Sequence, residues 1–405
     1  MWASARRTGA HHGPVECWTA DRLATEVDRL GARGLPYGEL HAELAARIRR
    51  LVPVDAMCWH GLDPDTKLLT TANPVELLHG GFLTPETEAN AAGAVVTSEY
   101  LRDDVNTFAA LAARRTPVGI LSETTRGRPQ RSARYVEYLE PIGTPFEMRV
   151  AMVTRGRAWG CVVLHRTQAA GDFTPKEARI MARLSRPIAE ALRGSYRVDA
   201  ARRPHEDRAP GLLVLDARDE VELITAPAVA LLELVARDDP AHRAVPGGAL
   251  SLAAQVRRHG RAGRPAPPLH VPTSTGWLTF HGSLPDGAPS GRVAIVVQRA
   301  GEEYAVPLRL EAFGLTARER EVAALVARGL DTAAIAERLV ISPWTVQDHL
   351  KAVFAKTNTR SRRELLSQVF FNDQLPGIVA RDPLNAGGHL QPPGAGQARQ
   401  ISLRS

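Results

Sequence analysis

Three polar residues in the C-terminal part of the chain, Gln347, Asp348 and Lys351, carry side chains that can recognise DNA base edges. A glutamine amide can pair with adenine through two hydrogen bonds, a lysine can donate to guanine, and an aspartate can accept from cytosine. Their spacing places all three on one side of a helix whose apolar side contains Val346 and Leu350. We therefore expect these three residues to face base edges.

The same segment carries side chains suited to phosphate contacts, which position a protein on DNA without selecting a sequence. Hydroxyl, indole and cationic groups in and around the expected helix make up this set: Ser342, Trp344, Thr345, Lys356, Arg360 and Arg362. Lysine and arginine cluster here, whereas the preceding helices carry Glu319, Glu321 and Glu337. This distribution favours a DNA-facing surface over the alternative, an ordinary solvated basic surface.

Two cysteine–histidine pairs suggest a second kind of chemistry. Cys58 and His60 are two residues apart on one expected strand, and Cys161 and His165 are four apart on another, so each pair shares a face. If the strands are neighbours, a metal or haem site becomes geometrically possible. The simpler interpretation is that the cysteines are small core residues, since free cysteine is among the most buried residue types. We favour that interpretation and predict neither a metal nor a cofactor.

Motifs of common enzyme classes are missing from the sequence. It contains no G-x-x-x-x-G-K-[ST] phosphate loop, no G-x-S-x-G nucleophile elbow and no H-E-x-x-H zinc motif. Glu137 and Glu140 are separated from Glu147 by prolines and a glycine, so nothing marks any two of them as a catalytic pair. We therefore predict that the protein is not an enzyme.

The elements that would position the base-reading residues have recognisable helix starts. Thr316 and Glu319 form a capping box, in which a hydroxyl and a carboxylate satisfy backbone N–H groups at a helix start. Asp331 caps a short second helix, and Ser342-Pro343 starts a third. A short helix, a tight turn and a third helix with a polar outer side form the helix-turn-helix pattern, which places the third helix in the major groove.

The segment closely resembles the LuxR-type (GerE-like) DNA-binding domain. The matching strings are LTARERE at 315–321, IAERLVISPWTVQDHL at 335–350, KAVFAKT at 351–357 and SRREL at 361–365. The resemblance implies an all-α four-helix domain over residues 308–373. The sequence departs from the family at 357–360, where a glycine-containing turn is usual, but Asn358 tolerates the left-handed conformation.

A fourth helix is expected after a second capping box at Ser361 and Glu364. In the LuxR-type family this helix commonly forms the dimer contact, so the resemblance implies a dimer that reads two half-sites. The apolar residues that would serve either this contact or the module's own core are Leu366, Val369 and Phe370.

Length and composition set the broader limits. A chain of 405 residues is long enough for two or three domains. The net charge of +7 and the pI near 9.7 suit a nucleic-acid partner. Three widely spaced cysteines fit a reducing cytoplasm, and no signal peptide or apolar run of the ~20 residues of a membrane helix occurs. We expect a soluble cytoplasmic protein.

Residues 21–196 are predicted to form an α+β domain with an antiparallel sheet. The expected elements are helices at 37–51 and 175–193, strands at 56–62, 67–71, 146–154 and 158–166, and a helical region at 86–138. The last strand and helix, WGCVVLHR followed by FTPKEARIMARLSRPIAEAL, resemble the end of a GAF sensor domain. That resemblance implies a small-molecule ligand or a dimer contact.

A second α+β domain is expected over residues 211–300, after a polar, proline-containing linker at 197–210. Its expected elements resemble a PAS-like fold, in which a small sheet cups helices. They are strands at 211–216, 221–225, 277–283 and 292–298 and a helix at 228–235. A second GAF-like domain or a new α+β fold would give the same pattern. Residues 1–20 and 376–405 are expected to be disordered.

These features predict a sequence-specific DNA-binding transcriptional regulator that reads the major groove with a helix at 343–356, under control of upstream sensor domains. We expect it to bind double-stranded DNA as a homodimer, with no membrane partner. The alternative is a cytoplasmic ligand-binding signalling protein whose C-terminal bundle mediates dimerisation or protein contact. The alternative predicts no salt-sensitive binding to duplex DNA.

Overall fold

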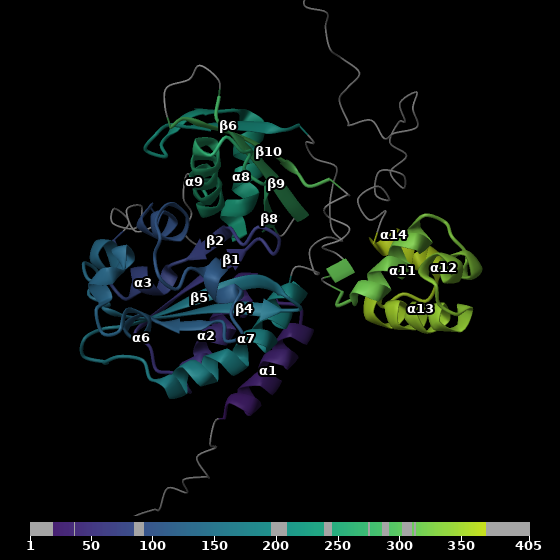
Figure 1. Ribbon diagram of the computed structural model, residues 1–405, viewed down its shortest axis with the longest axis horizontal. Helices are drawn as coiled ribbons and strands as arrows, with labels where there is room; N and C mark the ends of the chain where they lie inside the picture. Colours follow the sequence, from purple (N-terminus) through teal and green to yellow (C-terminus); the bar gives the residue numbers. More distant parts are fainter. Residues whose placement is uncertain are drawn as a thin grey trace, which may run out of the picture.

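The computed structural model describes residues 19–35, 37–84, 93–195, 209–238, 245–273, 276–285, 291–301, 310–311 and 313–369. Two sheet-containing units are stacked on each other, and a small helical module lies to one side of them (Figure 1). Nearly all of the predicted disordered ends, and most of the predicted linker at 197–210, fall outside the described residues. No helix among the described residues is long and apolar enough to cross a membrane.

The first unit is an α+β domain built on a five-stranded antiparallel sheet of order β2-β1-β5-β4-β3. Its strands are β1 (Ala56–Leu62), β2 (Leu69–Asn73), β3 (Val118–Ile120), β4 (Phe146–Thr154) and β5 (Arg157–Arg166). Its helices are α1 (Ala20–Ala32), α2 (Tyr37–Ile48), α3 (Val75–His79), α5 (Phe108–Ala112), α6 (Leu121–Thr125) and α7 (Pro175–Ser195), with the short turns η1 (Thr97–Leu101), η2 (Pro129–Arg131) and η3 (Tyr135–Leu139).

Helices α1, α2 and α7 cover one face of this sheet, and their apolar sides share a core with β1, β4 and β5. Helices α1 and α7 pack closely at Gly31 of α1, where an added Cβ would lie only 3.0 Å from the Cα of Ala191 in α7. The short helices and turns between β2 and β4 lie on the other face.

Two expectations for this domain need correction. The predicted disorder of residues 1–20 is wrong at its end, because Thr19 caps α1 and its Oγ1 accepts from the Arg22 N–H at 3.2 Å. The strand predicted at 67–71 starts later, at Leu69. Lys67 has a left-handed φ of 60°, which belongs to the turn that Asp63 closes by accepting from the Lys67 N–H at 2.8 Å.

The second unit contains another five-stranded antiparallel sheet, of order β7-β6-β10-β9-β8. Its elements are β6 (Gly211–Leu215), β7 (Val221–Ile224), α8 (Ala226–Asp238), α9 (Gly247–Arg261), β8 (Leu269–Thr273), β9 (Gly276–Ser283) and β10 (Val293–Arg299). Counted in chain order within each unit, both sheets have the order 2-1-5-4-3. Helices α8 and α9 pack on one face of the second sheet.

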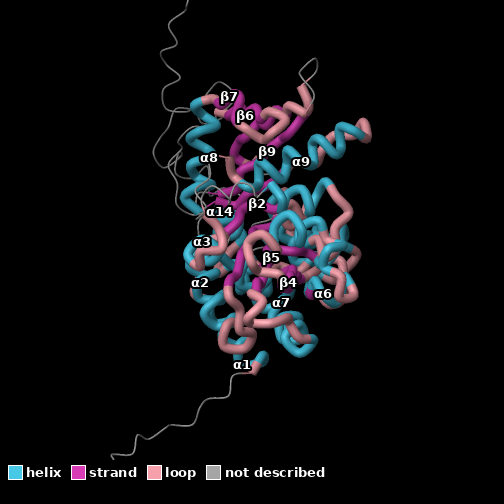
Figure 2. The backbone as a smooth tube through the Cα atoms, turned by 90° about the vertical axis from the view of Figure 1, so that its left-hand side faces the viewer, coloured by secondary structure: helices cyan, strands magenta, loops and turns pink. Residues whose placement is uncertain are grey.

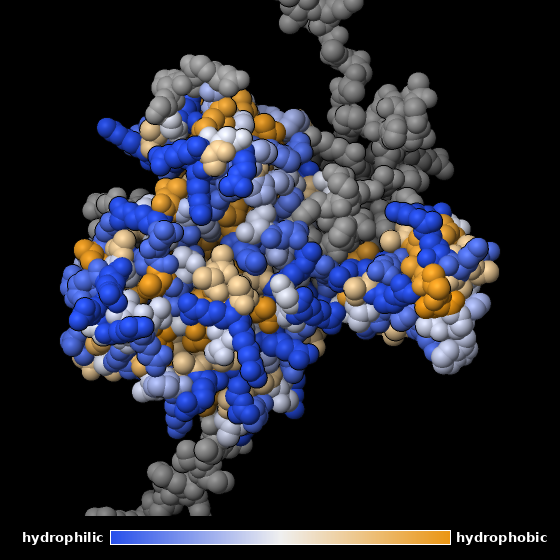
Figure 3. Space-filling model, viewed as in Figure 1, coloured by the Kyte–Doolittle hydropathy of each residue, from blue (hydrophilic) through white to orange (hydrophobic). Residues whose placement is uncertain are grey.

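The opposite face of the second sheet is partly apolar and open. Figure 3 shows hydrophobic residues gathered in the region of β6 in this view. Exposed apolar side chains on the strands of this sheet include Leu223 and Val296.

The two sheet-containing units share one continuous apolar core, which joins the upper face of the first sheet to α8, α9 and the second sheet. Figure 2 shows β2 between the two units. At this junction the carboxylate of Asp63, at the end of β1, is fully buried. Its Oδ2 accepts from the His270 N–H at 2.9 Å and lies 3.2 Å from the Nδ1 of the same residue.

The C-terminal module consists of four helices: α11 (Ala317–Ala327), α12 (Thr332–Leu339), α13 (Pro343–Thr357) and α14 (Arg362–Val369). Residues of all four helices meet in one core, centred on Val322, Ile335, Val346, Val353 and Leu365, each with no exposed surface. The predicted order of helices is therefore confirmed.

Candidate nucleic-acid interface

Helix α11 begins with the predicted capping box. The Oγ1 of Thr316 accepts from the Glu319 N–H at 3.3 Å, and the Thr316 N–H donates to Oε2 of Glu319 at 2.7 Å. The carboxylate is almost fully buried, and the Nζ of Lys356 lies 2.7 and 2.6 Å from its two oxygens. Burial opposes ionisation, but these hydrogen bonds and the Lys356 charge outweigh it and lower the pKa of Glu319.

The turn between α12 and α13 has an unusual residue at its centre. Val340 ends α12 with φ 55° and ψ 50°, in the left-handed region that β-branched residues rarely adopt. Its side chain is 90% exposed. Ser342 then caps α13, with its Oγ accepting from the Thr345 N–H at 3.0 Å, and Pro343 occupies the first helical position. The turn is thus short and fixed at both ends.

Helix α13 has the two faces that its sequence predicts. Val346, Leu350 and Val353 are buried in the module, whereas Gln347 and Lys351 are exposed and Asp348 is half-buried on the other side. The Nζ of Lys351 lies 3.5 Å from Oδ1 of Asp348, in a pair exposed enough to exchange partners. The Gln347 amide lies 3.5 Å from the Thr332 hydroxyl.

Trp344 extends the exposed face of α13 toward its N-terminus and is 72% exposed. With Gln347 and Lys351 it forms a surface that the described parts of the upstream domains leave open. Tryptophan is enriched at binding interfaces, where its ring packs on a partner and its N–H can donate a hydrogen bond.

Two residues of the predicted phosphate set are bound inside the module. Lys356 is held by Glu319, as described above. Arg362 donates to the Leu330 carbonyl at 2.7 Å and to the Thr332 hydroxyl at 2.8 Å, which ties α14 to the start of α12. Both cations therefore support the bundle in the free protein, a role that sequence spacing missed. Contact with phosphate stays a prediction for the whole set: Ser342, Trp344, Thr345, Lys356, Arg360 and Arg362.

The fourth helix differs in part from the expected arrangement. Glu364 accepts from the Arg360 N–H at 2.7 Å, not from Ser361, so only the serine half of the second capping box forms. Leu366 is half-buried against the module's own core. The Val369 side chain and Phe370 lie outside the described residues, so the dimer contact stays a prediction.

The cysteine–histidine pairs lie together, as the neighbouring strands allow. In the β1–β5 register His60 is opposite Cys161, and Ala56 is opposite His165. Among the described residues, no group of three or more histidine, cysteine, aspartate or glutamate side chains is placed to hold a metal. Burial raises the pKa of Cys161 and lowers the pKa of His165 to about 4, so the thiol and the imidazole are both neutral at pH 7.

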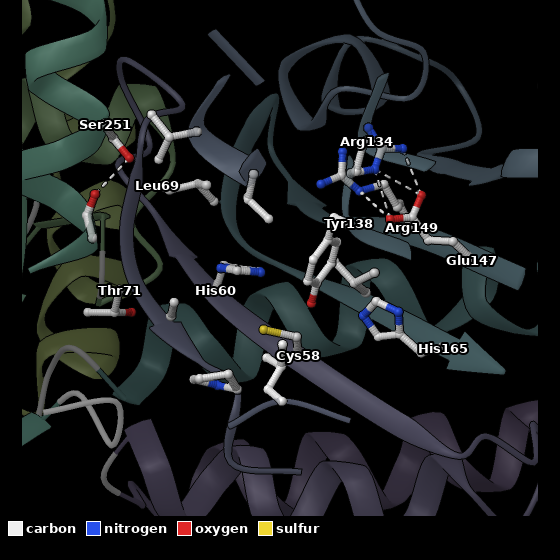
Figure 4. Close-up of a pocket in the computed structure, with 17 residues that line it drawn as sticks. Cys58, His60, Leu69, Thr71, Arg134, Tyr138, Glu147, Arg149, His165 and Ser251 are labelled. Carbon is white, nitrogen blue, oxygen red and sulfur yellow. Dashed lines mark hydrogen bonds and ion pairs between the residues drawn. The ribbon is translucent and has the colours of Figure 1, made fainter. Parts of the chain in front are cut away.

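These strands instead border a cavity of about 50 Å3 on the upper face of the first sheet. In Figure 4 the hydroxyl of Tyr138 and the ring of His165 converge on Cys58. At one end Arg134 makes a two-pronged pair with Glu147, with distances of 3.0 Å from Nε to Oε1 and 2.7 Å from Nη2 to Oε2. Cys58, His60 and His165 stand out in the sequence, but the other lining residues do not, because they are far apart in the chain.

Arg149, beside this pair, is bound to Glu99, and its Nε lies 3.4 Å from Oε1 of Glu147. Arg134 also lies 3.4 Å from Asp104. Burial opposes the charge on Glu147, but the two guanidinium groups outweigh it and lower the pKa of Glu147. Each charged group at this end of the cavity is therefore paired within the protein.

The helical module contacts the first domain through its first residues. Arg155 donates to the carbonyls of Gly314 and Leu315 at 2.9 and 3.2 Å. Glu311 lies 3.1 Å from Arg157 of β5 and 3.6 Å from Arg320 of α11. Burial nevertheless raises the pKa of Glu311, so these ion pairs do not fully offset its desolvation.

Two family models match the chain. Residues 314–369 match that of bacterial regulatory proteins of the luxR family, and residues 39–192 match the GAF domain. A monoamine regulon transcriptional regulator of Klebsiella aerogenes is 45% identical over 56 residues, which cover 14% of this chain and 25% of that protein. A putative HTH-type transcriptional regulator of Aeromonas salmonicida is 48% identical over 65 residues, covering 16% and 33%.

These matches cover limited parts of the proteins. The chain spans between 6% and 33% of the length of the curated relatives that it matches. Among solved structures, the phage VqmA–DPO complex is 22% identical, covering 39% of this chain and 79% of that chain, with a TM-score of 0.21. The Escherichia coli DhaR(N)–DhaL complex is 13% identical, covering 71% and 92%, also with a TM-score of 0.21.

The two family matches coincide with the first sheet domain and with the helical module. The chain therefore carries a GAF domain followed, at its C-terminal end, by a helix-turn-helix domain of the luxR family of bacterial regulatory proteins.

Proposed function

We propose that the protein is a sequence-specific DNA-binding transcription regulator that inserts α13 into the major groove. The observation that carries this proposal is the two-sided α13: its apolar side holds the bundle together, while Trp344, Gln347 and Lys351 lie open on the other side. A second helix followed by a tight turn is the arrangement that presents such a helix to DNA.

Base recognition is assigned to Gln347, Asp348 and Lys351, and phosphate contacts to the residues at the ends of α13 and α14. The Asp348–Lys351 pair can open, because the lysine side chain is 76% exposed. Lysine and arginine contacts to phosphate release counterions, so the affinity should fall steeply as salt rises.

The upstream domains are proposed to act as sensors, with a small molecule bound to the GAF domain. We assign the middle unit to a PAS-like fold, supported by a five-stranded sheet with both helices on one face. The active form is proposed to be a homodimer in which a signal favours the arrangement of two α13 helices that matches two half-sites.

The test is selection of bound duplexes from a random-sequence pool by the full chain, followed by affinity measurements at several salt concentrations. The proposal predicts a recurring motif and an affinity that falls with salt. Recovery of no motif, together with salt-insensitive binding, would favour a protein–protein role for the C-terminal bundle.

A further inference from the structure

The middle domain supplies part of the wall of the GAF cavity. Gly247 and Ser251 of α9 line it, together with Cys58, His60 and Tyr138 of the GAF domain (Figure 4). We propose that this cavity is a ligand site shared by the two domains, and that it takes a small, uncharged, mainly apolar molecule with one hydrogen-bonding group. The inference rests on the proposed regulatory function and names the ligand class and the way its binding is transmitted.

The size of the cavity limits the ligand to a few heavy atoms. A volume of about 50 Å3 holds only a few water molecules, since each water needs roughly 10–15 Å3 of space open to a water-sized sphere. Much of the lining is apolar, including Leu69, Leu83 and Val163. A small apolar body fits these walls better than a strongly hydrated group.

The charges around the cavity argue against an ionic ligand. Two guanidinium groups, of Arg134 and Arg149, face three carboxylates, of Glu99, Asp104 and Glu147, and all five are paired with one another. An anion would add to this excess of negative charge. A cation would have to displace an arginine from a buried pair, which leaves an uncompensated charge.

One polar group remains available to a ligand. The Nε of Arg149 is buried and, among the described residues, donates no hydrogen bond. Oε1 of Glu147 lies 3.4 Å from this Nε in the ion pair. A hydroxyl or carbonyl oxygen on the ligand would supply the missing acceptor, and a buried donor gains by finding one.

The shared wall is tightly fixed, so filling the cavity affects both domains. A Cβ on Gly248 would lie 2.8 Å from the Thr70 carbonyl, which shows how closely the start of α9 rests on β2. Arg258 of α9 donates to the Tyr100 carbonyl at 3.3 Å, and the Tyr100 hydroxyl accepts from the Leu69 N–H of β2 at 2.7 Å. A ligand that contacts both sides therefore favours one packing of the two domains over others.

The experiment uses the full chain and a substitution on the middle-domain side. Gly247 belongs to the cavity lining, and a Cβ added there meets no atom within 4 Å, so Gly247→Leu enlarges a lining residue without a clash at its Cβ. Gly38→Leu is the matched control, because Gly38 also has no atom within 4 Å of an added Cβ and lies exposed on α2. Gly247→Ala gives an intermediate size and is a favourable change within a helix.

The probes are isobutanol and its charged counterparts, isobutyrate and isobutylammonium, titrated by saturation-transfer NMR. Isobutanol should bind the unmodified chain and Gly38→Leu equally. Its Kd should rise by roughly tenfold, or ~1.4 kcal/mol, in Gly247→Leu and by less in Gly247→Ala. The charged probes should not bind.

Three results would overturn the inference: no isobutanol binding, equal binding to Gly247→Leu, or equal binding of a charged probe. DNA affinity measured on the same samples separates this outcome from failure of the proposed function. If DNA binding is absent while the isobutanol pattern holds, only the regulatory role fails. If DNA binding is intact while the pattern is missing, only the ligand site fails.

Discussion

At the scale of single residues, Lys351 is the side chain on which base selection depends most clearly. Its charged group is exposed at the middle of α13 and, in the part of the chain that the structure describes, is engaged only by Asp348. We predict that Lys351→Ala weakens binding by ~1–3 kcal/mol at one base position and leaves other positions unchanged. Affinities for a set of single-base-pair variants of the selected site test this. Lys176→Ala, which makes the same charge change at an exposed position of α7, is the control. An equal loss of affinity for every variant of the site would instead assign Lys351 to phosphate contact.

Val340 gives a second prediction at this scale. Its left-handed backbone costs roughly 1–2 kcal/mol that glycine would not incur, and its exposed side chain contributes little burial. Part of the gain is lost because glycine has more freedom in the unfolded chain. We predict that Val340→Gly raises the free energy of unfolding by about 1 kcal/mol and that Val340→Ala raises it less. Chemical unfolding followed by circular dichroism measures this, and a lower stability of the glycine variant would refute it.

At the scale of elements, the ion pair between the start of α11 and the end of α13 makes the module sensitive to acid. The pKa of Glu319 is lowered in the folded protein, so its contribution to stability is complete above the ordinary glutamate pKa of about 4.3 and is lost as the pH falls below it. We predict a drop in the unfolding temperature between about pH 5 and 3 that is smaller in Lys356→Met. Thermal scans across this range test it; equal slopes would show that the pair contributes nothing.

The helices and strands that the sequence predicts correctly are those with local signals. Thr316, Asp331 and Ser342 fix the starts of α11, α12 and α13, because each caps backbone groups a few residues away. Helix α9 is not among the predicted elements, and its Gly247, Gly248 and Gly260 are poor helix formers. A glycine is required at position 248 by tertiary packing, since the close approach of the Thr70 carbonyl leaves no room for a side chain.

At the scale of the whole molecule, the helical module is held against the GAF domain by polar contacts near its first helix. Arg155 is about half exposed and is bonded to the carbonyls that precede α11. We predict that Arg155→Ala broadens the distribution of distances between a label on α13 and one on α7, while Arg115→Ala, an exposed arginine elsewhere in the GAF domain, does not. Pulsed electron spin resonance on the full chain measures this distribution. An unchanged distribution would mean that the other contacts, such as the Arg157–Glu311 pair, fix the module without Arg155.

Features that join distant parts of the chain were beyond sequence reasoning. The predicted surface residues of α13 could be placed by helix periodicity, but Lys356 pairs with Glu319 across 37 residues and so serves the fold. The GAF cavity likewise combines Cys58 with Ser251, and the junction combines Asp63 with His270. Spacing in one sequence carries no information on such contacts, because they depend on how separate elements pack.

Hydroxyl-radical footprinting of the full chain, free and bound to its selected duplex, tests directly whether α13 enters the major groove. Trp344 is 72% exposed and should be oxidised readily in the free protein. If α13 enters the major groove, oxidation of the peptide containing Trp344 should fall sharply on DNA binding, while the buried Trp59 and Trp159 should not change. Unchanged oxidation of Trp344 in a saturated complex would contradict the account.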